Sequence, residues 1–200
     1  MQSDENKKIF ILSLHRSGTQ STHQLLQNAG FNALHWPEIV GGVDYQAQVL
    51  GKETNLKAIT KTLAPVIAQY DALSDAPIPV LYKELHKSYP DARFIALYRS
   101  PYDWLLSIRK HINTRELVAY EKVQYWHYLK NRPERICEVT DYELLEMHIQ
   151  HHADLLRHFQ GNPQFFLCHL IDETVGEKIC HFLGVPPLAM PDIDYAREIK

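Results

Sequence analysis

The sequence has little of what marks membrane, secreted or disulfide-bonded proteins. None of its apolar runs reaches the roughly 20 residues that cross a bilayer, so a membrane is not among the expected partners. The first residues, MQSDENKK, hold no apolar core of a secretory leader. Three cysteines in 200 residues are too few for a disulfide framework. Together these absences favour a cytoplasmic location.

The sequence also lacks an excess of basic residues. Its net charge is −3 at pH 7, whereas broad affinity for nucleic acid needs a basic face, so nucleic acid is not an expected partner. What is present suits a globular protein, because 45% of the residues are hydrophobic and only 8 are glycine and 11 proline. A chain of this length buries a sizeable core, and we expect a single domain over residues 1–200.

Apolar runs typical of buried strands alternate along the chain with segments of helical periodicity. We expect strands at residues 8–14, 70–75, 92–98 and 164–170. Helices are expected at residues 22–29, 55–70, 80–89, 103–112, 116–130, 141–159 and 173–183, with a loop over 31–42. This alternation predicts an α/β fold built around a parallel sheet.

The first expected strand ends in a short polar turn, LHRSGTQST, at residues 14–22. Gly18 allows the backbone to approach an anion closely, and the free amides of the following helix N-terminus point to the same place. Arg16 adds a fixed positive charge. Hydroxyl donors come from Ser17, Thr19, Ser21 and Thr22. The turn therefore predicts a phosphate-binding loop.

This loop is not the Walker A loop of ATP and GTP hydrolases. That motif has the form G-x-x-x-x-G-K-S/T, but Ser13 stands at its first glycine and Thr19 at its lysine. A hydrolase of ATP or GTP is therefore disfavoured. A nucleotide or small-molecule kinase that binds ATP in this loop stays open as an alternative, which Mg²⁺-dependent binding of ATP would favour.

The expected strand at residues 92–98 also ends in a polar turn, within the stretch LYRSPYDWLLS. Arg99 leaves the carboxyl end of this strand, where ligands of open α/β sheets bind. Ser107 follows about two helical turns later. An arginine and a serine placed in this way can hold a second phosphate, apart from the one in the first loop.

Together, the two turns resemble the nucleotide-binding signatures of sulfotransferases that use 3′-phosphoadenosine 5′-phosphosulfate (PAPS). That family has P-K-S-G-T-T in the first loop and R-D/N-P-x-x-x-x-x-S in the second, where this chain has Arg16 at the lysine and Ser100 at the Asp/Asn. KSYPDARFIALYRSP and EKICHFLGVPP are similar to other parts of the family, and HRSGTQST followed by HWP resembles a bacterial-type subgroup. The resemblance implies a P-loop NTPase-like, three-layer sandwich with a central parallel sheet.

The resemblance also implies an activity. The protein would transfer the sulfuryl group of PAPS, without a metal, to a hydroxyl or amine of a small-molecule or glycan acceptor. Arg16 and the amides of residues 18–20 would stabilise charge on the departing phosphate, while Arg99 and Ser107 would hold the 3′-phosphate. The expected donor-binding residues are Arg16, Ser17, Gly18, Thr19, Gln20, Ser21, Arg99 and Ser107. A nucleotide-binding protein that keeps the fold without turnover is an alternative from another class.

The general base that removes the acceptor's proton is expected to be Asp75. Well-known members of the family have a histidine followed by Leu-Pro at this place, and YDALSDAP puts Asp75 there. A carboxylate can act as the base if burial raises its pKa; the alternative is that Asp75 caps the next helix. His15, inside the first loop, is the next catalytic candidate, followed by His35 and Glu84.

The remaining histidines and aromatic residues admit simpler explanations. Histidines at positions 148, 151 and 152 share one helix face, and Cys–His pairs stand at 168–169 and 180–181. Neither group has a recognised zinc spacing, so a packed core or a solvated helix face is the expected setting. Trp36, Tyr125 and Trp126 either line an acceptor pocket or pack in the core.

Overall fold

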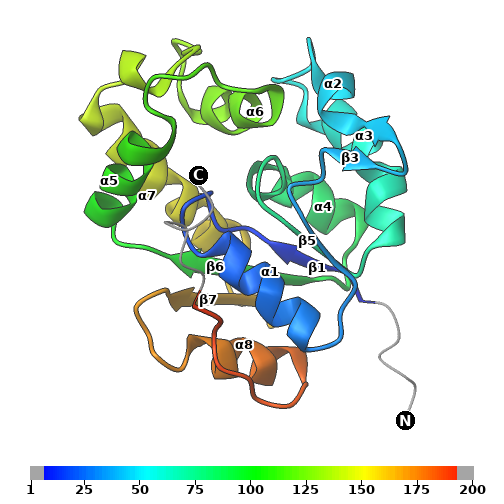
Figure 1. Ribbon diagram of the computed structural model, residues 1–200. Coiled ribbons are helices and arrows are strands. Elements are labelled where there is room, and N and C mark those ends of the chain that lie inside the picture. The colour runs from blue at the N-terminus through cyan, green and yellow to red at the C-terminus, as the bar shows by residue number, and fades with distance from the viewer. Residues whose placement is uncertain (1–6, 193–200) are drawn as a thin grey trace.

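A parallel sheet with the strand order β2-β5-β1-β6-β7 runs through the middle of the molecule (Figure 1). The structure is a computed structural model that describes residues 7–192, so the first six residues, on which the leader expectation rests, lie outside the described range. The strands of this sheet are β1 (Ile9–Ile11), β2 (Ala33–His35), β5 (Ala72–Ser74), β6 (Arg93–Tyr98) and β7 (Phe165–His169). A separate hairpin consists of β3 (Ile39–Val40) and β4 (Val43–Asp44).

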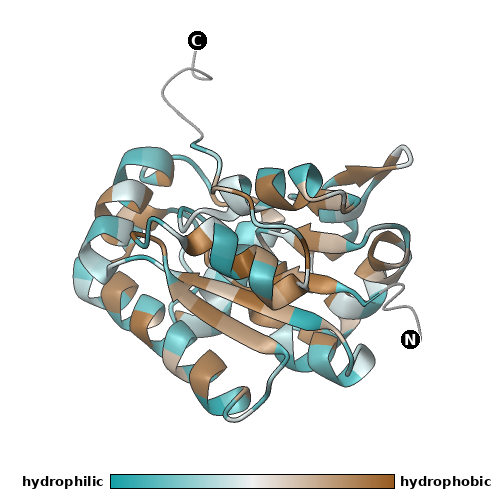
Figure 2. Cartoon of the chain, turned by 90° about the horizontal axis from the view of Figure 1, so that it is seen from below, coloured by the Kyte–Doolittle hydropathy of each residue, from teal (hydrophilic) through white to brown (hydrophobic). Residues whose placement is uncertain are grey.

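Helices cover both faces of the sheet. On one face, Ile9 and Ile11 of β1 pack against α1 and α8; on the other, Phe10 and Leu12 pack against α3, α4, α6 and α7. In Figure 2 the strands are mostly brown, whereas the helices mix brown and teal. The predicted three-layer α/β sandwich is confirmed. The helices are α1 (Thr19–Asn28), α2 (Tyr45–Val49), α3 (Leu56–Gln69), α4 (Tyr82–Ser88), α5 (Pro101–Ile112), α6 (Ala119–Tyr128), α7 (Asp141–His158) and α8 (Val175–Leu183), with short 3-10 turns η1 (Ile78–Leu81) and η2 (Ile136–Glu138).

A second apolar cluster lies where α5, α6 and α7 meet. It joins Leu14, which follows β1, to Trp104 of α5, Tyr125 of α6 and Met147 of α7. Trp104 is fully buried, and its indole N–H donates to the carbonyl oxygen of His15 at 3.0 Å. This cluster therefore fixes the segment that leaves β1 against the helices on the carboxyl side of the sheet.

The prediction of a loop over residues 31–42 is wrong in part. It contains the edge strand β2, whose residues Ala33 and His35 pair in parallel with Ala72 and Ser74 of β5. A strand of three residues is too short to show a period of two, so its sequence pattern resembles that of a loop. This pairing has a functional consequence, because it sets the end of β2 beside the end of β5.

The other element boundaries differ from expectation at their ends. The strand expected at 8–14 forms its ladder only over Ile9–Ile11, because the chain then turns out of the sheet. The helix expected at 80–89 divides into η1 and α4, and the one expected at 116–130 begins at Ala119 and ends at Tyr128. Helix ends depend on caps and packing, which periodicity does not report.

The histidine face of α7 is packed in the core. His148, His151 and His152 are at most 5% exposed. Tyr128 O–H donates to Nδ1 of His151 at 2.9 Å, and Nε2–H of His151 donates to the carbonyl oxygen of Leu12 at 2.7 Å. His151 therefore ties α7 to α6 and to the end of β1 as a neutral ring. Within residues 7–192, no three His, Cys, Asp or Glu side chains gather as a metal-binding group.

Among the helices that the structure describes, none combines the length and apolar character needed to cross a bilayer.

Burial of these histidines predicts acid sensitivity. Desolvation lowers the pKa of His148 and of His151 to about 3, whereas an unfolded histidine titrates near its usual value of about 6.5. Below that pH the unfolded state binds more protons, so stability falls as pH drops from about 6.5 towards 3, by up to about 1.4 kcal/mol per pH unit for each histidine. Urea unfolding at pH 7.5, 6 and 5 measures this slope.

The variant His148→Phe isolates one contribution. Neither ring nitrogen of His148 has a hydrogen-bond partner among the described residues, so the replacement breaks no bond. The pH slope of unfolding should be shallower in this variant than in the wild type. An unchanged slope would contradict the account of buried, neutral histidines.

Candidate active site at the carboxyl edge of the sheet

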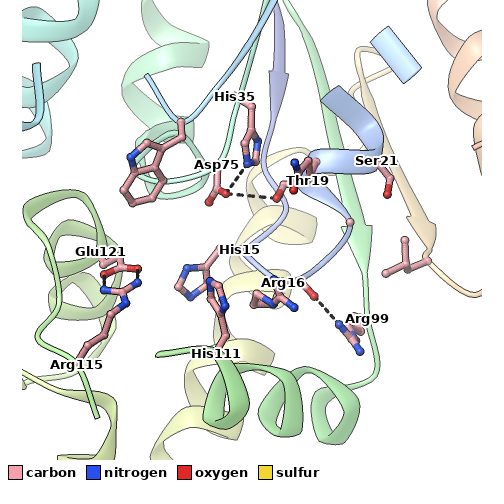
Figure 3. A pocket seen from close by; sticks show the side chains of 14 residues that line it. His15, Arg16, Thr19, Ser21, His35, Asp75, Arg99, His111, Arg115 and Glu121 are labelled. Atoms are coloured by element: carbon pink, nitrogen blue, oxygen red, sulfur yellow. Dashed lines mark hydrogen bonds and ion pairs between the residues drawn. The ribbon is translucent and has the colours of Figure 1, made fainter. Parts of the chain in front are cut away.

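A pocket of about 470 Å³ opens where four neighbouring strands end. The residues that follow β1, β5 and β6 contribute Arg16, Asp75 and Arg99 to its lining, and the end of β2 contributes His35 and Trp36. Figure 3 shows Arg16, His35, Asp75 and Arg99 around the same pocket, each carried by a different strand end. Carboxyl ends of parallel strands share one edge of a sheet, which is where ligands of open α/β folds bind.

Backbone strain concentrates at this edge. Outside glycine, the described residues with positive φ are four, and three of them line the pocket: Arg16 (65°), Trp36 (55°) and Asp75 (70°). Trp36 and Asp75 lie directly beyond the ends of β2 and β5, and Arg16 lies in the turn between β1 and α1. Left-handed backbone at a non-glycine residue costs of order 1–3 kcal/mol, and such strain collects at functional sites.

The first loop presents free backbone amides to the pocket. Gly18 is the N-cap of α1, with φ 77° and no side-chain cap bond, so the first amides of the helix have no intrahelical partner. A Cβ at Gly18 would lie 2.7 Å from Cδ1 of Leu170, so a side chain would fill this cradle. Thr19, Gln20 and Ser21 line the pocket beside it. The arrangement suits an anionic group.

Arg99, in the turn after β6, and Ser107 of α5 both form hydrogen bonds with Arg16 in the first loop. Arg99 Nη1 donates to the carbonyl oxygen of Arg16 at 2.8 Å, and Arg16 Nε donates to Ser107 Oγ at 3.1 Å. Burial lowers the pKa of Arg99 below its usual value, against the opposing charge of Asp103 and with a smaller contribution from Arg16, yet Arg99 remains a cation at neutral pH. The two arginines that were predicted to hold separate phosphates therefore lie at one end of one pocket.

Asp75 is a buried carboxylate with defined partners. Its Oδ1 accepts the amide of Ala76 at 2.7 Å, and its Oδ2 accepts Thr19 Oγ1–H at 3.4 Å and lies 3.2 Å from His35 Nε2. Burial raises the pKa of Asp75, against the opposing influence of His15. A carboxyl group with a raised pKa that faces a pocket is suited to accept a proton.

His15 lies on the opposite side of Asp75 from His35. It is 5% exposed, and its Nε2 lies 2.5 Å from the hydroxyl oxygen of Tyr125. Burial lowers the pKa of His15 below the usual value for histidine. One of its two ring nitrogens is thus occupied by Tyr125, which makes His15 less open to an acceptor than Asp75.

The wall of the pocket away from Arg99 contains an ion pair that the sequence did not reveal. Arg115 Nη1 and Nη2 donate to the two carboxylate oxygens of Glu121 at 2.8 and 2.6 Å. Burial alone would raise the pKa of Glu121, but Arg115, the charge of His15 and the amide of Val118 together hold this pKa below its usual value. His111 of α5 lies nearby and also lines the pocket. No strand end or turn motif marks this segment, so its sequence offered no signal.

The predicted site residues divide into groups. One pocket gathers most of them: His15, Arg16, Gly18, Thr19, Gln20, Ser21, Asp75 and Arg99. Ser107 lies behind Arg16 instead of lining the pocket. Ser17 is fully buried and does not line the pocket. Of the secondary candidates, His35 and Trp36 line the pocket, whereas Glu84 and Trp126 do not, and Tyr125 contacts His15.

Comparison with known proteins assigns the family. Residues 8–198 match the profile of the family described as "Sulfotransferase domain". The chain belongs to this sulfotransferase family. A curated relative from Aspergillus versicolor, "Ava biosynthesis cluster protein M", is 26% identical over 113 residues, which cover 54% of this chain and 44% of that protein. This sulfotransferase-family chain therefore matches less than half the length of that relative.

A solved structure shares the fold. The crystal structure of a sulfotransferase from Alicyclobacillus acidocaldarius aligns with a TM-score of 0.54 and 16% sequence identity, and the alignment covers 95% of this chain and 87% of the other. At that identity the likeness shows the fold alone. The predicted P-loop NTPase-like sandwich with its parallel sheet is confirmed.

Replacing Gly18 tests the geometry of the first loop in this sulfotransferase-family chain. Gly18→Ala puts a Cβ at φ 77° and against Leu170, so we expect it to lower the free energy of unfolding by more than the roughly 1–2 kcal/mol that left-handed backbone costs alone. Gly30→Ala is the matched control, because its φ is 92° and nothing lies within 4 Å of the added Cβ. Urea unfolding compares the two, and equal losses would show that Leu170 does not close the cradle.

Proposed function

We propose that this protein transfers the sulfuryl group of PAPS to a hydroxyl or amine of a small-molecule or glycan acceptor. One observation carries the proposal: two anion-binding turns and a buried carboxylate open on the same pocket. Membership of the sulfotransferase family supports it.

The donor fits the cationic half of the pocket. The amides of residues 18–21 and the Arg16 guanidinium bind the 5′-phosphosulfate, because no side chain caps the first amides of α1. Arg99 binds the 3′-phosphate, and Ser107 accepts a hydrogen bond from Arg16 Nε and so orients the Arg16 guanidinium. Arg16 then stabilises negative charge that grows on the 5′-phosphate as the sulfur–oxygen bond breaks.

Asp75 acts as the general base in this proposal. It removes the proton from the acceptor, whose oxygen or nitrogen forms the new bond to sulfur. The old bond from sulfur to the phosphate oxygen breaks, and 3′-phosphoadenosine 5′-phosphate (PAP) leaves with that electron pair. A raised pKa strengthens Asp75 as a base, and the hydrogen bonds from Thr19 and Ala76 favour its ionised form.

Calorimetric titration separates this proposal from the kinase alternative. PAP without metal should bind with micromolar affinity, and Mg-ATP should not bind, because Thr19 stands where a Walker A loop has its lysine. The opposite pattern would favour a kinase. Tight PAP binding with no PAP released from PAPS across a panel of phenols, alcohols, sugars and amines would favour a protein that binds nucleotide without turnover.

Arg99→Ala tests the assignment of the 3′-phosphate. Loss of a charge-assisted hydrogen bond costs about 1.5–3 kcal/mol, so PAP affinity should fall roughly 10- to 100-fold, while 5′-AMP, which has no 3′-phosphate, should lose much less. Lys110→Ala is the control, because Lys110 is an exposed cation of α5, the helix that follows Arg99, and lies outside the pocket. Equal losses for PAP and 5′-AMP would contradict the assignment.

Asp75→Asn tests the base. Asparagine has the same shape and tolerates left-handed backbone, so the variant should fold and bind PAP as the wild type does. Release of PAP in the presence of an active acceptor should fall by about 10² to 10⁴. If His15→Gln abolishes transfer and Asp75→Asn does not, the base is His15.

A further inference from the structure

A chain of hydrogen-bonding groups runs from the edge strand β2 into the pocket. His35, at the end of β2, is paired with Ser74 of β5. Its Nδ1 lies 3.0 Å from Ser74 Oγ, and its Nε2 lies 3.2 Å from Asp75 Oδ2. Figure 3 shows the His35 ring against Asp75 on the side away from His15. The chain ends at Asp75, the proposed base, whereas Ser74 and His35 take no part in the steps above.

The chemistry of these groups selects one tautomer of His35. The ring is largely buried, and desolvation lowers its pKa to about 4, so it is neutral at pH 7. A neutral imidazole carries one N–H, and an ionised carboxylate only accepts. The hydrogen must therefore stand on Nε2, facing Asp75, while Nδ1 accepts the hydroxyl hydrogen of Ser74. Ser74 is 2% exposed and has a rotatable O–H, which suits this role.

This tautomer also orients the carboxylate. An ionised carboxylate has about four lone-pair positions. Thr19 and His35 occupy Oδ2, and the amide of Ala76 occupies one position on Oδ1. The remaining position on Oδ1 is left for a proton from the acceptor. His35 thus accounts for which oxygen of Asp75 is the basic one.

We propose that His35 is a positioning residue for the base, with Ser74 fixing its tautomer. Donation from His35 Nε2–H keeps Asp75 ionised and turns Oδ1 towards the acceptor. This role rests on the proposed function, in which Asp75 removes the acceptor's proton. It explains why a three-residue edge strand is held in parallel register with β5 at this point.

The other titratable groups around His35 and Asp75 do not replace the N–H that His35 Nε2 presents to Asp75. His15 from the first loop and Glu121 from α6 face Asp75, and Arg115 is engaged with Glu121. His23 of α1 lies against His35 with ring centroids 5.7 Å apart, and burial lowers the pKa of His23 as well. The turn η1, which follows Asp75, contributes apolar residues only.

A pair of variants separates hydrogen bonding from packing. The amide nitrogen of His35→Gln can occupy the position of Nε2 and still donate, whereas His35→Leu fills space without a donor. Loss of the donor destabilises ionised Asp75, so the acidic limb of the kcat/KM profile should move to higher pH in His35→Leu. At pH 7, kcat should fall about 10- to 100-fold, which matches the 1.5–3 kcal/mol of a hydrogen bond to a charged group.

The readouts distinguish positioning from a structural role. KM for PAPS and the affinity for PAP should stay unchanged in both variants, because the donor half of the pocket is separate. In His35→Gln the acidic limb of the kcat/KM profile should lie at the wild-type pH. The same is expected of His23→Leu, which removes the neighbouring ring but does not contact Asp75. A loss of kcat in His35→Leu that is uniform over pH, or a limb that His35→Gln does not restore, overturns the proposal.

Histidine side-chain NMR gives a test that needs no acceptor. With ¹⁵N-labelled protein, the His35 signal is assigned by its absence in His35→Gln. It should show a neutral ring with the hydrogen on Nε2 at pH 7 and no titration above about pH 5. A hydrogen on Nδ1, or a charged ring at pH 7, overturns the positioning role alone. A wild-type protein that binds PAP but transfers to no acceptor overturns the proposed function and this role together.

Discussion

The parallel ladder between β2, β5, β1 and β6 is the constraint on which the site depends. Ile9 of β1 pairs with Ala72 of β5 and with Arg93 of β6, and Ala33 of β2 pairs with Ala72. Strands held in this register end at the same edge, so the segments that follow them converge, although Arg16 and Arg99 are 83 residues apart in the chain. The strained turns at that edge persist because the surrounding core is tightly packed on both faces of the sheet.

The pocket is divided electrostatically. Arg16 and Arg99 stand at the end formed by β1 and β6, and the charge of Arg16 is close enough to help lower the pKa of Arg99. Asp75 and the paired Glu121 stand at the other end. Two guanidinium groups beside free helix amides suit a ligand with several negative charges. The carboxylate end suits an acceptor that arrives as a neutral hydroxyl or as an amine and must lose a proton.

The sequence predicted the position of site residues that come soon after a recognisable strand. Buried apolar runs mark β1, β5 and β6, so Arg16, Asp75 and Arg99 could be placed at one sheet edge from the order of apolar runs and polar turns. It was uninformative where position depends on tertiary packing. The strand β2 is too short for periodicity, and Glu121 reaches the pocket from a helix whose packing against α2 and η1 no local pattern predicts. For the same reason, the contact of Ser107 with Arg16 was not foreseen.

A crystal structure of the protein with PAP would test the central claim most directly. The account predicts that the 5′-phosphate lies on the amides of residues 18–21 beside Arg16, that the 3′-phosphate contacts Arg99, and that Asp75 faces the open side of the 5′-phosphate. PAP bound with its 5′-phosphate away from the first loop, or outside this pocket, would contradict it.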